Sequence, residues 1–459
     1  MVKSSVKNQV FPTNGEVVQT YDALNPERIG ERIDAADSAY ADWRSVTMDE
    51  RGAYLQEAAA ILERNKERYS GLMALEMGKP IRDGRAEIEK CALLCRHVAE
   101  SAAEMLAPEI VPTDARKSFV AFQPLGVVFG VMPWNYPFWQ VFRFAAPSLM
   151  AGNAVLLKHA SNVPGCSLAI EALMHDAGFP PTLFQSLLVS SEQVQAVIDH
   201  PSVKAVALTG SKAAGQAVAA HAGRRIKKTV LELGGSDPYL ILEDADLDLA
   251  VDACAAGRLL NSGQSCIAAK RLIVAAVVKE DFEQRLMKKI KSVKMGDPFD
   301  EATEIGPLAR NDLRDILHRQ VRKSIEHGAR CLLGGEVPDG KGYFYPPTLL
   351  TDVRPGMPAF DEETFGPVAS VISATDEQDA ILLANNTNFG LGAAVFTRDI
   401  KRGEHIAAEE LEAGNCFVNA FVKSDPRLPF GGIKGSGYGR ELSHYGIKSF
   451  VNIKTVYVA

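Results

Sequence analysis

Residues 203–215 read Val-Lys-Ala-Val-Ala-Leu-Thr-Gly-Ser-Lys-Ala-Ala-Gly, an apolar run followed by a glycine and then by residues that favour a helix. This pattern predicts a strand over 203–208 that leads through Thr209–Gly210 into a helix, as in a βαβ unit. Glycine at such a junction lets a phosphate approach the N-terminus of the helix. The segment lacks the G-x-G-x-x-G spacing of a dinucleotide fingerprint, so alone it is a weak signal.

The alternation of strands and helices continues on both sides of this segment. Strands are predicted over residues 126–132, 154–157 and 182–188, and helices over 48–77, 139–150, 167–177 and 193–199. Strands separated by helices of about ten residues indicate βαβ units and a parallel sheet. We therefore expect an α/β fold.

A second α/β domain is predicted after Gly234–Gly235. Pro238–Leu242 reads as a strand, and the acidic residues 243–248 lead into a helix. The last apolar run, Ser449–Val458, is strand-like and follows a glycine-rich loop. A terminal strand with no helix after it commonly completes a sheet elsewhere, including in a partner subunit.

Composition excludes several classes of protein. The 459 residues carry a net charge of −7 without a basic tract, which disfavours nucleic-acid binding. Seven cysteines form no disulfide framework, which indicates a reducing compartment, and the histidines show no metal-binding spacing. Glycines and a proline interrupt the most apolar stretch, residues 125–139, so it is too short to span a membrane. We expect a cytoplasmic protein with no metal, membrane or nucleic-acid partner.

Three segments carry residues suited to covalent catalysis. Cys266 ends a glycine-containing loop, where backbone N–H groups can stabilise a thiolate. Glu232 stands between two leucines and before Gly-Gly, so desolvation should raise its pKa toward that of a general base. Asn135, held between Pro133 and Pro137, can donate its amide to an oxyanion. Taken singly, the three are equally consistent with a structural cysteine, a salt-bridged glutamate and a rigid turn.

Taken together, six segments occur in an order that resembles the NAD(P)-dependent aldehyde dehydrogenases. They are Met132-Pro-Trp-Asn-Tyr-Pro137, Thr209-Gly-Ser-Lys-Ala-Ala-Gly215, Leu231-Glu-Leu-Gly-Gly235, Gly263-Gln-Ser-Cys266, Glu362-Glu-Thr-Phe-Gly-Pro367 and Pro429-Phe-Gly-Gly432. The resemblance runs from about Glu76 to Glu441. Within that family the chain looks most like the succinate-semialdehyde dehydrogenases of bacterial and cyanobacterial type, through residues 139–143, 157–162 and 423–430.

The resemblance implies a reaction through a thioacyl-enzyme. By similarity, Cys266 attacks the aldehyde carbonyl, and the Asn135 amide with the Cys266 backbone N–H holds the oxyanion. Glu232 then activates the water that hydrolyses the thioester. The implied cofactor contacts are Trp134, Lys158, Ser161, Gly210, Ser211, Glu363 and Phe365.

The resemblance also implies three structural parts. Residues 1–107 and 128–233 would form a Rossmann-like cofactor domain, and residues 234–424 an α/β catalytic domain. Residues 108–127 and 425–459 would form a small β oligomerisation element and a bridging C-terminal segment, in a homodimer or homotetramer.

Ser161 bears on the choice of cofactor. Many NAD-preferring relatives carry a Glu at this position, three residues after the lysine, where a carboxylate would repel a 2′-phosphate. Its absence favours NADP, contacted by Lys158 and Ser161, with NAD as an alternative cofactor. The competing interpretation is a serine that caps the following helix ahead of Pro164.

The expected substrate is a small aldehyde, succinate semialdehyde, whose far carboxylate would meet Arg143. This arginine lies eight residues after Asn135, about 12 Å along a helix opened by the Trp-Asn-Tyr-Pro turn. Ser265 and Ser424 are weaker candidate contacts. An arginine paired with a carboxylate at a subunit interface is the competing interpretation. Another ω-carboxy aldehyde, such as glutarate semialdehyde, and a non-catalytic homologue are the rival functions.

Overall fold

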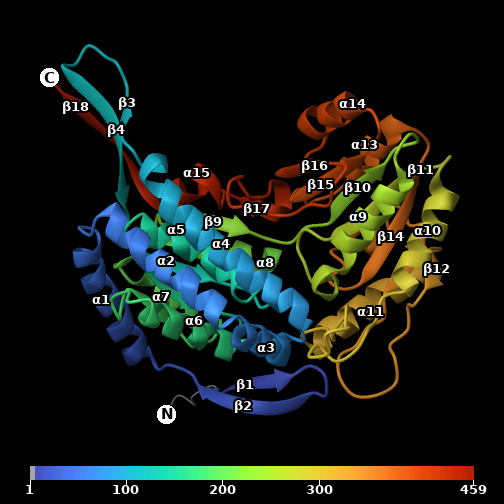
Figure 1. The fold of residues 1–459 in the computed structure, drawn as a ribbon, viewed down its shortest axis with the longest axis horizontal. Helices are drawn as coiled ribbons and strands as arrows, with labels where there is room; N and C mark the ends of the chain where they lie inside the picture. Colours follow the sequence, from blue (N-terminus) through green and yellow to red (C-terminus); the bar gives the residue numbers. More distant parts are fainter. Residues whose placement is uncertain (1–5) are drawn as a thin grey trace.

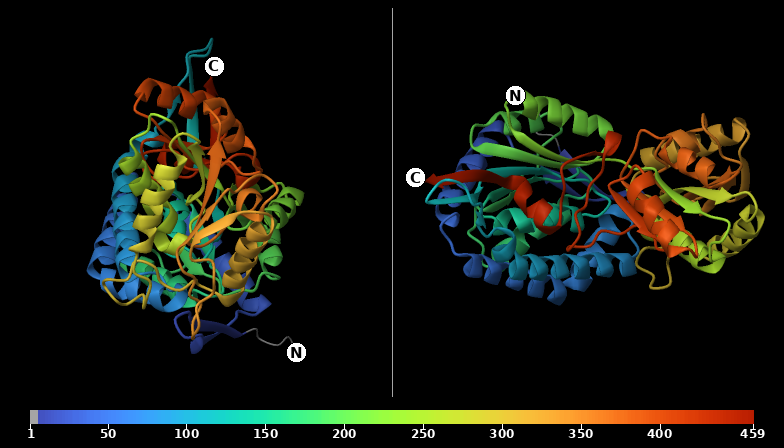
Figure 2. Two further views of the ribbon diagram at one scale, coloured as in Figure 1. Left: turned by 90° about the vertical axis from the view of Figure 1, so that its right-hand side faces the viewer. Right: turned by 90° about the horizontal axis from the view of Figure 1, so that it is seen from above.

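Two lobes, each built around its own β-sheet, lie side by side in the computed structural model, which describes residues 6–459 (Figure 1). A three-stranded arm projects from the first lobe (Figure 2). A two-stranded ribbon, β1 (Val6–Phe11) and β2 (Glu16–Asp22), lies on the opposite side of the molecule from this arm. The expected α/β fold is confirmed.

The first lobe contains a six-stranded sheet with the order β17-β9-β8-β5-β6-β7. Its strands are β5 (Val127–Val131), β6 (Ala154–Lys158), β7 (Phe184–Ser186), β8 (Val203–Thr209), β9 (Lys228–Glu232) and β17 (Gly437–Tyr438). Every neighbouring pair is parallel except β17 with β9. From β5 the chain builds outward through β6 and β7 and then returns to build β8 and β9 on the other side. Ligands of open parallel sheets bind at such a switch point.

Helices cover both faces of this sheet and create its core. They are α1 (Pro26–Trp43), α2 (Met48–Arg64), α3 (Lys66–Met77), α4 (Ile81–Met105), α5 (Trp139–Met150), α6 (Pro164–Asp176), α7 (Val194–Asp199) and α8 (Lys212–Arg224). Strand β5 reads Val-Val-Phe-Gly-Val, the continuous apolar run of a strand covered on both faces. The helix predicted over residues 48–77 is two helices, because Asn65 leaves helical geometry (φ −106°, ψ 16°) and separates α2 from α3.

The second lobe contains a seven-stranded sheet with the order β12-β13-β14-β11-β10-β15-β16. Its strands are β10 (Asp237–Ile241), β11 (Ala269–Ala275), β12 (Arg330–Leu333), β13 (Thr348–Thr351), β14 (Val368–Ala374), β15 (Gly392–Phe396) and β16 (Asn415–Val418). Only β12 is antiparallel to its neighbour. Along β10, Tyr239 and Ile241 enter one hydrophobic core and Leu240 enters the other, so both faces of the sheet are covered.

The two cores of this lobe are closed by different helices. Helices α9 (Leu247–Leu259) and α10 (Lys279–Lys291) contribute to the core that contains Tyr239. Helices α11 (Asn311–Glu326), α12 (Pro358–Asp361) and α13 (Glu377–Asn385) contribute to the other. Helix α14 (Ile400–His405) continues into one π-helical turn, residues 406–410.

The arm is an antiparallel sheet with the order β18-β4-β3. It consists of β3 (Glu109–Ile110), β4 (Lys117–Pro124) and β18 (Val451–Val458), and the short helix α15 (Ser443–Ile447) precedes β18. The segment predicted as a terminal strand therefore pairs with residues of the 108–127 region. Apolar side chains on the arm, including Ile110, Ile453 and Tyr457, are exposed.

The chain crosses between the lobes twice. It leaves the first sheet at the end of β9 and enters the second at β10, and it returns between β16 and β17. Glu232 is the last residue of β9, so the first crossing begins beside it. Within residues 6–459, no helix has the length and apolar character needed to cross a membrane.

Gly130 is required by the packing of α5 on β5. A Cβ atom at this position would collide with the ring of Phe144, which is fully buried. We expect Gly130→Ala to lower the free energy of unfolding by about 1–3 kcal/mol, the usual effect of overpacking a core. Urea denaturation followed by circular dichroism measures this change.

Gly30→Ala in α1 is the matched control. Nothing lies within 4 Å of a Cβ at Gly30, so this change should stabilise the helix by up to about 1 kcal/mol. Equal stability of Gly130→Ala and the wild type would contradict the packing described for β5.

Candidate active site

The residues predicted for catalysis and cofactor binding gather at one edge of the six-stranded sheet. Val131 at the end of β5 pairs with Lys158 on one side and with Leu208 on the other, and Thr209 pairs with Glu232. The carboxyl ends of β6, β5, β8 and β9 therefore lie in a row. The segments that follow them carry Trp134 and Asn135 after β5 and Gly210 and Ser211 after β8. This edge contains the switch point between β5 and β8.

Asn135 is hydrogen-bonded to the loop that carries Cys266. Its side-chain Nδ2 donates a hydrogen bond to the Gln264 carbonyl (3.1 Å), and Asn261 Nδ2 donates to the Asn135 carbonyl (2.8 Å). Asn261 and Ser262 both adopt φ of 56°, a left-handed conformation unusual for residues other than glycine. Strained backbone of this kind is concentrated at functional sites.

The crossing loop after β9 packs against the same cysteine. A Cβ atom on Gly235 would lie 2.6 Å from the Cys266 carbonyl oxygen, so only glycine allows this approach. Cys266 itself is partly exposed. Burial raises the pKa of its thiol to about 12, while the Arg143 guanidinium and the Lys270 ammonium act in the opposite direction.

Glu232 is a buried carboxyl group with an unusual environment. It is 2% exposed, and in the described part of the chain neither of its carboxyl oxygens has a hydrogen-bond partner. Burial, followed by the nearby Glu441 carboxylate, raises its pKa well above the ordinary value, whereas Arg143 and Arg440 lower it. A carboxyl group with a raised pKa is suited to proton transfer near neutral pH.

Arg143 links the groups around Glu232. Its guanidinium forms a buried ion pair with Glu441, donates to Thr209 Oγ1 (3.4 Å) and lies over the Phe430 ring. Because it lowers the pKa of both Glu232 and Cys266, one cation influences both predicted catalytic groups. Glu441 was not singled out from the sequence, and no local pattern connects it with a residue so distant in the chain.

The prediction that one helix connects Asn135 with Arg143 is wrong. Helix α5 begins at Trp139, so Asn135 lies in the turn before it and the rise per residue of a helix does not apply between them. The carboxylate that pairs with Arg143 in this structure, Glu441, belongs to the same chain.

Glu363, Phe365 and Trp134 lie together beside the cysteine loop. Glu363 accepts a hydrogen bond from the Gly235 backbone N–H (3.0 Å), and its Oε1 is 3.4 Å from Lys270 Nζ. The rings of Phe365 and Trp134 meet edge to face at 5.7 Å. Lys270 also donates to the carbonyls of Ser265 (2.8 Å) and Cys266 (2.7 Å). Sequence reasoning missed Lys270, since a lysine in the apolar strand β11 carries no motif.

Lys158 is the last residue of β6, and Ser161 lies in the turn that follows it. Burial lowers the pKa of Lys158, and among the residues described no carboxylate lies within ion-pair distance of it. Ser161 is exposed. The residue that caps α6 is Val163, without a side-chain hydrogen bond, so the interpretation of Ser161 as a helix cap is wrong.

Gly210 and Ser211 open α8. The Ser211 hydroxyl accepts a hydrogen bond from the Ala214 backbone N–H (3.3 Å) and caps the helix. The N-terminus of α8 therefore faces the switch-point edge with its positive dipole end, which suits an anionic phosphate. The same edge carries Lys158, which has no carboxylate partner in the described residues, and the aromatic pair Trp134 and Phe365. Together these groups fit a dinucleotide that carries an additional phosphate.

A pocket of about 830 Å³, partly open to solvent, contains Cys266. The three residues predicted to contact substrate, Arg143, Ser265 and Ser424, all line it. The Tyr136 hydroxyl is hydrogen-bonded to Ser265, and burial raises the pKa of Tyr136. Aromatic side chains form much of the remaining wall, namely Tyr136, Trp139, Phe421 and Phe430.

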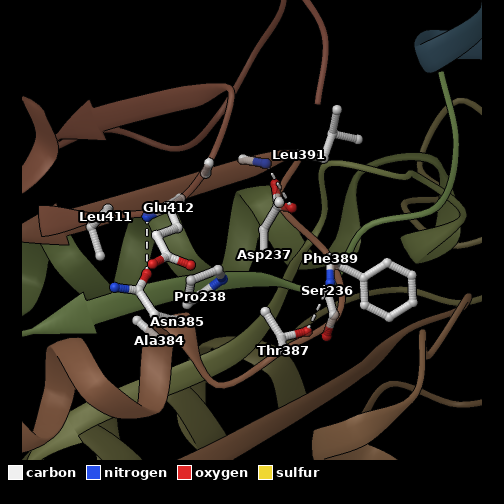
Figure 3. Close-up of a pocket in the computed structure, with 14 residues that line it drawn as sticks. Ser236, Asp237, Pro238, Ala384, Asn385, Thr387, Phe389, Leu391, Leu411 and Glu412 are labelled. Atoms are coloured by element: carbon white, nitrogen blue, oxygen red, sulfur yellow. Dashed lines mark hydrogen bonds between the residues drawn. The ribbon is translucent and has the colours of Figure 1, made fainter. Parts of the chain in front are cut away.

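A second, smaller cavity of about 240 Å³ is lined in part by Asp237 (Figure 3). Asp237 Oδ1 accepts a hydrogen bond from the Gly392 backbone N–H (3.0 Å), and burial raises its pKa to about 7. None of the residues predicted for the site lines this cavity. In the part of the chain that is described, no group of three or more His, Cys, Asp or Glu side chains is arranged to hold a metal ion.

The fold and the cysteine pocket beside a dinucleotide-type sheet are those of an oxidoreductase. The sequence model of a protein family, described as the aldehyde dehydrogenase family, matches residues 2–456, and the chain belongs to that family. The resemblance found in its motifs is thereby confirmed.

Individual relatives agree with this membership. The chain is 50% identical over 450 residues to a probable succinate-semialdehyde dehydrogenase (NADP+) of Synechocystis, covering 98% of this chain and 99% of that one. It is 46% identical over 455 residues to succinate-semialdehyde dehydrogenase (NADP+) 1 of Mycobacterium tuberculosis, with the same coverage. The crystal structure of succinic semialdehyde dehydrogenase from Streptococcus pyogenes with NADP+ matches with a TM-score of 0.96 and 36% identity, covering 98% and 99% of the two chains.

Removing the cation beside Glu232 should change the pH dependence of activity. Arg143 lowers the pKa of Glu232, so Arg143→Met should raise it further. Because only the ionised carboxylate accepts a proton, the acidic limb of the kcat–pH profile should move to higher pH, and activity at pH about 7 should fall. Breaking the buried pair should also lower stability by about 3–5 kcal/mol.

Two variants control for this effect. Arg440→Met should move the limb in the same direction but less, and Glu441→Gln should move it to lower pH by removing the like charge. An unchanged acidic limb in Arg143→Met would show that this guanidinium does not control the pKa of Glu232.

Proposed function

We propose that the chain oxidises succinate semialdehyde to succinate, with NADP+ as the preferred hydride acceptor and NAD+ as an alternative. The observation that carries the proposal is the pocket itself, in which Cys266 shares aromatic walls with cationic side chains. An uncharged aldehyde needs no cation in its pocket, whereas a semialdehyde brings a carboxylate. The names of the Synechocystis and Mycobacterium tuberculosis relatives point to the same substrate and cofactor.

In the proposed reaction Cys266 attacks the aldehyde carbonyl through its thiolate. Asn135 Nδ2 has two N–H donors, of which one bonds the Gln264 carbonyl, so the other is available to an oxyanion together with the Cys266 backbone N–H. A nicotinamide held beside Cys266 would supply the hydride acceptor, and loss of hydride from the Cys266 adduct would leave a thioester on the sulfur. Glu232 then takes a proton from water, and the resulting hydroxide hydrolyses the thioester to the acid.

The proposed cofactor contacts divide between the two ends of the dinucleotide. Lys158 and Ser161 would hold the 2′-phosphate, and the α8 N-terminus with Gly210 and Ser211 would face the pyrophosphate along with Trp134. Glu363 and Phe365, which lie beside the cysteine loop, would hold the nicotinamide ribose and ring. Lys270, bonded to that loop and close to Glu363, would connect the cofactor end with the nucleophile.

A longer ω-carboxy aldehyde is the second candidate substrate. The cations and apolar walls that suit succinate semialdehyde suit its longer homologue as well, so glutarate semialdehyde belongs in the same assay. The relative rates with the two semialdehydes decide between them.

We also propose that the protein acts in the cytoplasm as a homodimer or homotetramer. All seven cysteines are free thiols, as a reducing compartment favours. The exposed apolar residues of the projecting arm support this assembly, because a second copy would cover them. Light scattering of the protein truncated before β18 tests the role of the arm.

The reaction is tested by following reduced cofactor with succinate semialdehyde. The wild type should turn over, and Cys266→Ala should lose activity while still binding NADP+, because a methyl group is no nucleophile. Glu232→Gln should give a burst of about one equivalent of reduced cofactor per site and then a slow steady state. Substantial turnover by Cys266→Ala would refute the nucleophile, and loss of the burst would place Glu232 before hydride transfer.

The choice of cofactor depends on charge at position 161. Ser161→Glu should weaken NADP+ relative to NAD+ by about 10- to 1,000-fold, the order expected from one repulsive pair a few ångströms apart. Ser161→Gln adds the same bulk without the charge and should preserve most of the NADP+ preference. The measurement is kcat/KM for each cofactor, and equal losses for both would show that Ser161 does not face the 2′-position.

A further inference from the structure

Lys90 is a pocket residue that no motif indicated. It belongs to α4, and it lines the pocket of about 830 Å³ together with Cys266. Its Nζ donates a hydrogen bond to Ser424 Oγ (2.7 Å) and lies 4.3 Å from the centre of the Trp139 ring. The ammonium is therefore held in a fixed place by a hydroxyl from the 421–430 segment and an indole from α5.

Most other charged groups that line this pocket have partners of their own, and Lys423 lies exposed at its rim. Arg143 is paired with Glu441, and Glu87 is paired with Lys79 while also accepting from the backbone N–H groups of Phe138 and Trp139. Asp83, which also lines the pocket, accepts from the Asn261 backbone N–H (3.0 Å). A second cation inside the pocket thus meets no anion that is free to neutralise it.

Lys90 has no carboxylate within 4.0 Å anywhere in residues 6–459. Burial, and after it the positive charge of Arg143, lowers its pKa to about 8. The charges that act in the other direction are Cys91 and Glu87 on its own helix and Asp425 beside Ser424. An ammonium desolvated in this way gains most when a ligand brings a carboxylate.

We propose that Lys90 and Ser424 together bind the far carboxylate of the ω-carboxy aldehyde. This assignment rests on the proposed function and names the residues that give it substrate specificity. Lys90 has three N–H donors, one of which is used by Ser424, and Ser424, by accepting from Lys90, keeps its own O–H free to donate. The two groups can therefore offer a carboxylate one donor from each side.

The aromatic walls complete the recognition. Trp139 and Phe421 line the same pocket as these polar groups and Cys266, and apolar walls suit the methylene groups of a short chain. Arg143 already shares its charge with Glu441, so Lys90 supplies the positive charge inside the pocket, and the exposed Lys423 adds one at its rim. Arg143 then contributes a hydrogen-bond donor to the substrate rather than an uncompensated cation.

The test compares Lys90→Met and Lys90→Arg on succinate semialdehyde and on butanal, its uncharged four-carbon analogue. In Lys90→Met the ratio of kcat/KM for the two aldehydes should fall about 10- to 100-fold, as expected for the loss of one charged hydrogen bond. Lys90→Arg should restore most of the ratio. Lys423→Met removes a charge from the exposed rim of the same pocket and should leave the ratio within about threefold.

Inhibition by succinate provides a readout that a purely structural lysine would not change. In the wild type the Ki should be constant below about pH 8 and rise above it, because only protonated Lys90 attracts the carboxylate. Lys90→Arg should abolish this rise, since arginine does not titrate in that range.

The outcomes separate the two proposals. A wild type that does not prefer succinate semialdehyde or glutarate semialdehyde to butanal would refute the proposed function and this assignment with it. A wild type with that preference, combined with an unchanged ratio in Lys90→Met, would refute the role of Lys90 alone. If the ratio of kcat/KM for succinate semialdehyde to that for butanal falls in Lys423→Met and not in Lys90→Met, the carboxylate binds at the rim of the pocket instead.

Discussion

The buried ion pair between Arg143 and Glu441 is the interaction on which the rest of the site depends. It joins α5, which packs on the six-stranded sheet, to the C-terminal segment that returns from the second lobe. Glu232 lies beside the pair without a hydrogen-bond partner of its own, in the part of the chain that is described. Its proton affinity is therefore set by burial and by neighbouring charges of both signs, Glu441 on one side and Arg143 and Arg440 on the other. Neither partner can be removed without leaving the other as an uncompensated buried charge.

The same pair explains how one pocket serves two chemical tasks. Because Glu441 neutralises Arg143, the guanidinium can sit near both Glu232 and the Cys266 thiol without filling the pocket with excess positive charge. Of the two pocket cations other than Arg143, Lys423 is exposed at the rim and Lys90 is partly buried, and Lys90 has no carboxylate partner within residues 6–459. In this arrangement Arg143 acts on proton transfer, and Lys90 is the cation proposed to recognise an anionic substrate. Lys270, behind the cysteine loop, fixes the backbone from the other side.

Local patterns in the sequence predict most of the fold and half of the site. The alternation around residues 203–215 predicts a parallel sheet, and the ends of β5, β8 and β9 do carry the residues named from the motifs. Periodicity could not reveal the interruption at Asn65, since a single non-helical residue leaves the apolar spacing on both sides nearly unchanged. Glu441 and Lys90 could not be found either, because their roles arise from pairings between distant segments, and a lysine on a helix normally faces solvent.

The central claim is that Glu232 keeps a strongly raised pKa inside this charge arrangement. Infrared difference spectroscopy of the free enzyme, with Glu232→Gln used to assign the carboxyl band, measures its protonation directly. The protonated band should persist at pH values where an ordinary glutamic acid, with a pKa of about 4.3, is fully ionised. A band that disappears at the ordinary value would contradict it, and would show that Glu232 is solvated or hydrogen-bonded rather than held in an apolar, unpartnered state.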